Sequence, residues 1–369
     1  VGRFRRRDPG KFVRRDFGFD RSGLGGKREW KDEKRGAKKE FFHLAGGGIG
    51  SDNRREFAAI MDRRQFTKLA GLGTVVGIGG ITASESGEEI IDIHQHIHFN
   101  GRRDEEFLIH QKALGVSKTV LLPAGTEMAR ASTHAGKSNG LAARVFGTEA
   151  AARFAAAYPD SFVYFCNEVP DADDAVAVIE KWLARGAIGI GESKFSLEVD
   201  AAPMIRLYEV AQAHEVPVLL HFQEGKYNLG FDRFHKVLER FPKVNFIGHA
   251  QTWWGNIDAK HVPSVMYPKG PITPGGLTDR YLSDYPNAYG DLSAGSGKNA
   301  FDRDPEHAAA FLLRHQDKLM LGTDCSDPFG QGEKCSGSGQ IANVRRFVSD
   351  PTAREKIFSG NAKRVLRLS

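Results

Sequence analysis

Short apolar runs rich in Val, Ile and Leu recur along residues 88–369, and they alternate with segments whose apolar positions have helical spacing. The runs predict eight strands, at 90–96, 118–122, 162–167, 188–192, 217–221, 244–249, 288–292 and 318–323. Apolar residues three and four apart predict helices between several of them, for example at 173–185, 202–214, 231–241 and 305–314.

Strand alternating with helix predicts right-handed crossovers and a parallel sheet. Eight such units over about 280 residues suit an α/β fold of the (β/α)₈ TIM-barrel type. A doubly wound open sheet is the structural alternative. No G-x-G-x-x-G follows the first strand, which disfavours the dinucleotide-binding form of that alternative.

A barrel would bring the carboxyl ends of its strands to one mouth, and these ends carry polar residues in this sequence. The residues are His94 and His96, Glu192, His221, His249, Asp291 and Asp324. Each of them closes an apolar run, as in VLLHF or LMLGTD, and singly each could be a turn or capping residue. Together they supply four imidazoles and three carboxylates around one opening, which indicates a metal site.

The first strand has histidines at alternate positions, His94, His96 and His98, which a strand presents on one face. Taken alone, this triplet leaves open both a metal site and a solvated polar edge. His98 lies one step beyond the other two, where the strand runs into the first loop. We expect it to contact substrate or the surroundings of an ion rather than to be a ligand.

An ordered set of motifs extends over about residues 88–368: DIHQH, LLHF, FIGHA, LGTDCSDP and IFSGNAKRVLRL. This set resembles the amidohydrolase superfamily, in the amidohydrolase-related branch of metal-dependent hydrolases and decarboxylases. The resemblance implies that His94, His96, His221 and Asp324 are metal ligands. It also implies that His249 steers the substrate or handles a proton, and Asp324 could accept the proton of an attacking water.

Three neutral imidazoles and one carboxylate suit a divalent ion, and we expect one Zn²⁺, with Mn²⁺ or Fe²⁺ as alternatives. A two-ion site is the other interpretation, because superfamily members with two ions bridge them at the end of the fourth strand. Glu192 and Lys194 stand there, and His249 would then become a ligand of the second ion. With one ion, Glu192, Lys194 and Asp291 are expected to contact the substrate or the ligands.

A long Gly/Pro-rich segment follows His249, and segments of this kind above a barrel mouth are commonly lids. Trp253 and Trp254, near its start, could stack on a flat substrate or anchor the segment by packing. The favoured reaction is hydrolysis of an amide, ester or lactone of a small molecule by a metal-activated water. Non-oxidative decarboxylation of a carboxylated aromatic or enoic acid is the alternative, and a non-catalytic binding barrel is a third. Homo-oligomerisation stays open.

The net charge of +6 comes from the first 60 residues. These hold 17 Lys and Arg against 9 Asp and Glu, which leaves 35 against 37 for the remainder. The near-neutral body argues against nucleic-acid binding by the folded domain. Residues 1–60 are interpreted as a disordered basic segment or an over-extended gene start. The three cysteines form no C-x-x-C pair and imply no disulfide framework.

Residues 61–84 resemble a twin-arginine signal peptide. Arg63 and Arg64 precede Phe66 and Lys68, and residues 69–83 are uncharged and rich in glycine. This stretch is short for a membrane span, which needs about 20 residues. We expect export by the twin-arginine machinery to the periplasm, or a cytoplasmic protein if the signal interpretation fails. The barrel domain would then comprise residues 88–369.

Overall fold

The computed structural model of the chain describes residues 87–123 and 145–368. All eight predicted strands are present in these ranges, and every pairing between neighbouring strands is parallel. They are β1 Ile90–Gln95, β2 Val116–Leu121, β3 Phe162–Tyr164, β4 Ile190–Ser193, β5 Val218–His221, β6 Phe246–His249, β7 Ala288–Asp291 and β8 Leu319–Met320. Their order in space is their order in the chain, with β1–β3 in one sheet and β4–β8 in another.

Backbone hydrogen bonds join these two sheets at both seams. Between β3 and β4, the Cys166 amide donates to the Gly189 carbonyl at 2.9 Å, and the Gly191 amide donates to the Cys166 carbonyl at 2.8 Å. Between β8 and β1, the Ile93 amide donates to the Leu321 carbonyl at 3.0 Å. The sheet therefore closes on itself as a parallel barrel, and the open doubly wound alternative is wrong.

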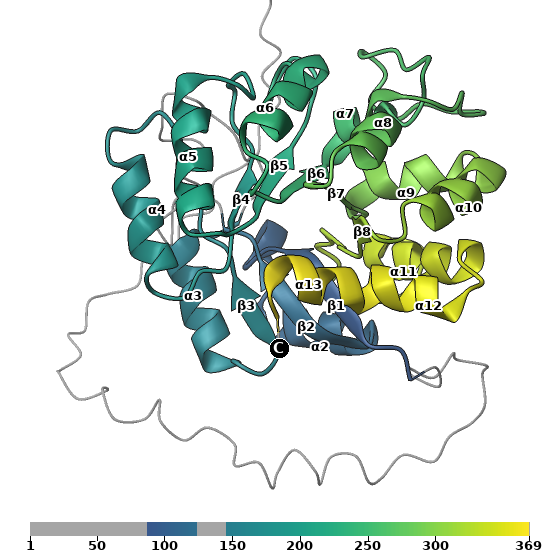
Figure 1. Ribbon diagram of the computed structural model, residues 1–369. Helices are drawn as coiled ribbons and strands as arrows, with labels where there is room; N and C mark the ends of the chain where they lie inside the picture. Colours follow the sequence, from purple (N-terminus) through teal and green to yellow (C-terminus); the bar gives the residue numbers. More distant parts are fainter. Residues whose placement is uncertain (1–86, 124–144, 369) are drawn as a thin grey trace, which may run out of the picture. The chain divides into compact units, whose positions relative to one another are not determined.

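Helices surround the strands (Figure 1). They are α2 Asp104–Ala113, α3 Thr148–Ala157, α4 Ala175–Leu183, α5 Ala202–Ala213, α6 Phe234–Arg240, α7 Ala250–Gly255, α8 Leu277–Asp284, α9 Ala294–Asp302, α10 Pro305–Arg314, α11 Ser336–Phe347, α12 Pro351–Glu355 and α13 Asn361–Leu366. Short 3₁₀ turns lie at Phe99–Gly101 and Phe231–Arg233, and a π-helical turn lies at Lys356–Gly360. The four helices named from the sequence correspond to α4, α5, α6 with the turn before it, and α10.

Within residues 87–123 and 145–368, the buried apolar side chains form two clusters, as a barrel requires. Inward-facing residues such as Leu219, Ile247 and Met320 pack inside the barrel, and side chains of α13 join them. A larger cluster fills the space between the strands and the surrounding helices. Most strand residues are buried on both faces, which explains the short apolar runs, although β2 begins with residues that are partly or fully exposed.

Strand β1 is irregular where the first histidine stands. Its pairing with β2 shifts register between Asp92 and Gln95. Ile91 and Ile93 belong to the cluster inside the barrel. His94, the residue directly after Ile93, faces the barrel mouth, so two consecutive side chains point inward. One extra residue in a strand reverses the face on which the following side chains lie. The register shift therefore lets both His94 and His96 point into the mouth.

The predicted segments 1–60 and 61–84 lie outside the described residues. No helix within 87–123 or 145–368 is long and apolar enough to cross a membrane.

Candidate metal centre

His94 and His96 face each other at the mouth through their Nε2 atoms, which lie 3.2 Å apart, and both side chains are buried. The His94 Nδ1 lies 2.6 Å from Asp291 Oδ2, and the His96 Nδ1 lies 2.7 Å from the Leu122 carbonyl oxygen. Because both of these partners accept hydrogen bonds, each Nδ1 carries the proton and each Nε2 presents a lone pair. Two opposed lone pairs repel unless a cation lies between them.

Asp324 supplies the third atom of this group. Its Oδ1 is buried without a hydrogen-bond partner and lies 3.3 Å from His96 Nε2 and 3.7 Å from His94 Nε2. Ligand atoms around a tetrahedral Zn²⁺ lie about 3.3–3.5 Å apart, given metal–ligand distances near 2.1 Å. The unsatisfied oxygen and the two free nitrogens therefore form a donor set that fits a divalent ion.

A second ligand group comprises Glu192, His221 and His249, all of them buried. The Glu192 Oε1 lies 2.5 Å from His221 Nδ1 and 3.9 Å from His249 Nε2. The other oxygen, Oε2, lies 3.4 Å from His96 Nε2. Glu192 thus stands between the two groups, with one carboxylate oxygen toward each. His221, expected as a ligand beside His94 and His96, groups with Glu192 instead.

Asp291 and Ser293 lie behind the histidines. The Ser293 hydroxyl donates to Asp291 Oδ2 at 2.7 Å and lies 3.0 Å from His249 Nδ1. Asp291 Oδ2 is also 3.2 Å from His249 Nδ1, so one carboxylate orients both His94 and His249. Ser293 was not predicted from the sequence. Its position two residues after Asp291 at the same strand end was the available signal.

The negative charges of the carboxylates dominate the electrostatics of the centre. Burial opposes a charge on His94, but Asp324 and Asp291 outweigh it and raise the pKa of His94 well above its usual value. Burial likewise opposes ionisation of Asp291 and Glu192, yet the neighbouring histidines hold the pKa of each carboxyl below its usual value. Burial, followed by the charge of Lys194, lowers the pKa of His221 to about 4. The centre therefore favours a bound cation, whether a proton or a metal ion.

His98 and Lys194 stand at the margin of the centre. The His98 Nε2 lies 3.5 Å from Asp104 Oδ1, and its ring stacks on Phe146 at 4.2 Å between centroids. The Lys194 ammonium lies 5.5 Å from the centre of the Tyr227 ring. Neither residue belongs to a metal-ligand group among the described residues. Both remain candidates for contact with a substrate.

Trp253 and Trp254 are buried in α7, at 0% and 2% exposure. Trp253 packs against Phe222 and neighbouring rings, while Trp254 packs against Phe301 and donates its indole N–H to the Asp291 carbonyl at 3.0 Å. The proposed stacking on a substrate is therefore wrong, and the packing alternative holds. The segment expected as a lid therefore begins with a helix, α7, whose apolar side chains are buried in the core.

Residues 256–276 follow α7 and reach the barrel mouth. Met266 Sδ accepts a hydrogen bond from Gln223 Nε2 at 3.5 Å, and Tyr267 Oη accepts one from Gln251 Nε2 at 3.2 Å. Gln223 Oε1 in turn lies 3.4 Å from His221 Nε2. Met266 and Tyr267 are 45% and 46% exposed, so the segment presents apolar surface beside the metal-ligand groups.

No family model matches the chain, and no curated protein matches it. Among solved structures, it is similar to an uncharacterised TIM-barrel protein from Bordetella bronchiseptica, with a TM-score of 0.51, 17% identity, and coverage of 76% of this chain and 99% of that one. It is also similar to YJJV, a TatD homolog from Escherichia coli K12, with a TM-score of 0.50, 14% identity, and coverage of 76% and 98%. These similarities agree with the closed parallel barrel, and the chain has the TIM-barrel fold.

A third similarity is more distant. A dihydroxybenzoic acid decarboxylase from Polaromonas sp. JS666, solved with bound manganese, has a TM-score of 0.48, 15% identity, and coverage of 76% of this chain and 97% of that one.

Proposed function

We propose that the chain is a metal-dependent hydrolase of the amidohydrolase superfamily that acts on an ester, lactone or amide of a small molecule. One observation carries the proposal. The buried Nε2 atoms of His94 and His96 lie 3.2 Å apart, and Asp324 Oδ1, which has no hydrogen-bond partner, lies beside them at the C-terminal mouth of the barrel. Active sites of TIM-barrel enzymes occupy this mouth.

We further propose a two-ion centre, which differs from the single ion favoured by the sequence. His94, His96 and Asp324 would hold one ion, and His221 with His249 would hold the other. Glu192 supports this division because its two oxygens face different groups. When bound, such ions polarise a substrate carbonyl and lower the pKa of water toward 7. Zn²⁺ and Mn²⁺ both suit these nitrogen and oxygen donors.

Asp324 is the carboxylate best placed to move a proton. Its side chain is 16% exposed, whereas those of Glu192 and Asp291 are 2% and 0% exposed. The pKa of Asp324 is lowered, because the nearby imidazoles outweigh the effect of burial, so the group is ionised and able to accept a proton at neutral pH. It would take the proton of the attacking water and return it to the leaving group.

Glu192, by contrast, contacts the histidine rings with both of its oxygens. Asp291 orients the rings of His94 and His249 through their Nδ1 atoms. Lys194, Gln223 and the apolar residues of 256–276 border the opening and would contact the substrate. Their mixed character favours a substrate with a polar reacting group and an apolar portion.

The experiment that tests this proposal is an assay of the metal-loaded full chain on a panel of lactones, aryl esters and amides, with parallel measurement of CO₂ from aromatic and enoic acids. The proposal expects metal-dependent hydrolysis of at least one panel member. CO₂ release without hydrolysis would replace it with the decarboxylase alternative. Absence of both activities in protein with its metal bound would favour a binding barrel.

A further inference from the structure

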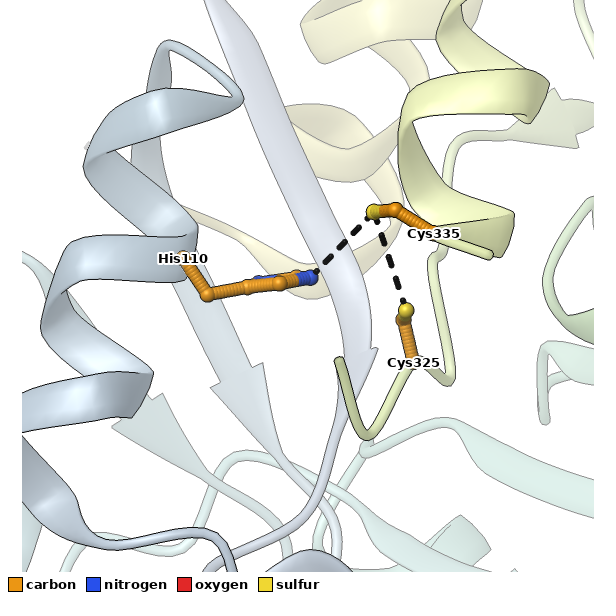
Figure 2. Close-up of side chains that lie close together, drawn as sticks. All are labelled: His110, Cys325 and Cys335. Atoms are coloured by element: carbon orange, nitrogen blue, oxygen red, sulfur yellow. Dashed lines mark hydrogen bonds between the residues drawn. The ribbon is translucent and has the colours of Figure 1, made fainter. Parts of the chain in front are cut away.

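A second group of metal-binding side chains lies outside the hydrolytic centre. It comprises His110 on α2, Cys325 in the loop after β8, and Cys335 directly before α11 (Figure 2). Their exposed fractions are 0%, 3% and 1%, so all three are buried. Two cysteines ten residues apart in the chain and a histidine more than 200 residues before them thus meet in the protein interior, and Cys335 interacts with both other side chains.

The separations within this group are those of ligands around one ion. The sulfur atoms of Cys325 and Cys335 lie 3.8 Å apart, and the Cys335 sulfur lies 3.6 Å from His110 Nε2. For a thiophilic ion with metal–sulfur distances near 2.3 Å and metal–nitrogen distances near 2.0 Å, trigonal or tetrahedral geometry places neighbouring ligand atoms about 3.5–4.0 Å apart. A disulfide needs sulfur atoms about 2.05 Å apart, and all three cysteines are free.

The orientation of His110 is set by its neighbours. Its Nδ1 lies 2.8 Å from Gln111 Oε1. The amide nitrogen of Gln111 donates to Asp92 Oδ2 at 3.0 Å and to Thr119 Oγ1 at 2.7 Å, so the amide oxygen must face the histidine. The Nδ1 of His110 therefore carries the proton, and the Nε2 lone pair is directed toward the cysteines. A ring nitrogen hydrogen-bonded to a fixed acceptor is the usual support of a metal-binding histidine.

From this geometry we propose that His110, Cys325 and Cys335 form a second metal site, which binds one thiophilic d¹⁰ cation, Zn²⁺ or Cu⁺. Two thiolates and an imidazole are soft donors, unlike the carboxylates and imidazoles of the hydrolytic centre. The three side chains complete a three-coordinate Cu⁺ site, whereas Zn²⁺ would take a further ligand such as water. The proposal does not rest on the hydrolase function.

A cation at this site would tie the hydrolytic centre to the outer helices. Cys325 is the neighbour of Asp324 in the chain, and its carbonyl accepts hydrogen bonds from Arg102 Nη1 at 2.7 Å and Gln95 Nε2 at 3.2 Å. Binding would thus fix the loop that carries Asp324 to α2 and α11. The proposed role of the site is therefore structural, because none of its three residues lies in the barrel mouth where the substrate would bind.

Cobalt absorption tests the site without interference from the first centre. The reduced, metal-free full chain is titrated with Co²⁺ under anaerobic conditions, and thiolate-to-cobalt charge transfer is followed in the near ultraviolet. Only sulfur ligands give this band, so ions in the histidine and carboxylate centre do not contribute. We expect the band to saturate at one thiolate-bound Co²⁺ per chain and to be abolished when Zn²⁺ or Cu⁺ displaces the cobalt.

The variants separate ligation from general effects on the fold. Cys335→Ser and Cys325→Ser should each remove the band, while Cys166→Ser, a buried cysteine remote from the cluster in the sequence, should keep it. Gln111→Met removes the acceptor for His110 and should weaken binding roughly 10- to 100-fold. Circular dichroism verifies that each variant is folded.

Wild-type protein gives a test that needs no variant. X-ray absorption of the Cu⁺-loaded chain should show sulfur neighbours at about 2.3 Å together with an imidazole. The proposal is overturned by a coordination shell without sulfur, by failure of Co²⁺, Zn²⁺ and Cu⁺ alike to bind through thiolate, or by a Cys325–Cys335 disulfide in the freshly isolated protein. Thiol counting after unfolding detects that disulfide, since it leaves one free thiol instead of three.

Discussion

Among single residues, Asp324 combines two properties, a contact with the candidate ligand histidines and a partly exposed side chain. Its Oδ1 faces the free nitrogens of His94 and His96, and its side chain is the most exposed of the three carboxylates at the centre. Asp324→Asn keeps the shape but cannot accept a proton, so kcat should fall by about 10²- to 10⁴-fold. Steady-state hydrolysis by the metal-loaded variant measures this effect.

Asp327→Asn is the matched control. Asp327 lies three residues later, and its Oδ2 accepts the amides of Phe329 and Gly330 in an exposed loop. This variant should retain nearly full kcat. If Asp324→Asn were as active as this control, the proton-accepting role of Asp324 would be abandoned.

The sequence allowed the candidate ligand residues to be named one by one, whereas their grouping could not be predicted. His94, His221, His249 and Asp324 each end an apolar run, and the ends of parallel strands must meet. Whether His221 lies beside His94 or beside Glu192 depends on side-chain directions in three dimensions, which no sequence period encodes. The approach of Ser293 to His94 and His249, and that of His110 to Cys335, could not be predicted for the same reason, because each of these pairs joins distant segments.

At the scale of elements, one buried carboxylate joins α8 to the end of α10. Asp279 Oδ1 lies 2.6 Å from His315 Nε2 and 3.0 Å from Arg314 Nη2. Burial would raise the pKa of Asp279, but His315 and Arg314 outweigh it and hold that pKa below its ordinary value of 3.8. Asp279→Asn should therefore lower the free energy of unfolding by about 2 kcal/mol at neutral pH.

The pH dependence of this loss follows from the direction of the shift. A depressed folded-state pKa means that the carboxylate stabilises the fold above pH 3.8, and that this contribution disappears as the pH falls through the folded value. Denaturant unfolding of both proteins from pH 7 to pH 3 should show the difference narrowing only at the acid end. A difference that stays constant over this range would contradict the assignment.

The strand and helix positions were largely predictable because most strand residues are buried on both faces of the sheet and each helix is buried on one face. Apolar runs and helical spacing are direct consequences of that burial. The register shift in β1 and the helix α7 were not anticipated. The first is a local backbone irregularity between Asp92 and Gln95, and the second lies in a segment whose glycine and proline content indicated a loop.

At the scale of the whole molecule, the closed barrel was predictable from the count and alternation of elements. The comparisons with solved structures agree with it. The N-terminal interpretation stays a prediction, because residues 61–84 lie outside the described ranges. We propose that this segment directs export by the twin-arginine route.

The export proposal predicts a clear result for the double variant Arg63→Lys, Arg64→Lys, expressed from Met61 in a bacterium with twin-arginine machinery. The wild-type chain should reach the periplasm in processed form, while the variant should stay unprocessed in the cytoplasm. Lys68→Arg, which keeps the charge after the pair, should be exported. Periplasmic recovery of the double variant at the wild-type level would refute the proposal.

In the proposed centre, two ions share Glu192 at the barrel mouth, and Mn²⁺ binding tests this arrangement most directly. Mn²⁺ favours oxygen and nitrogen donors over thiolates, so the group of His110, Cys325 and Cys335 does not add to the number of Mn²⁺ ions bound per chain. Elemental analysis and electron paramagnetic resonance of the Mn²⁺-loaded full chain should show two ions per chain with exchange coupling between them. A single uncoupled ion, or no retained Mn²⁺, would contradict the account.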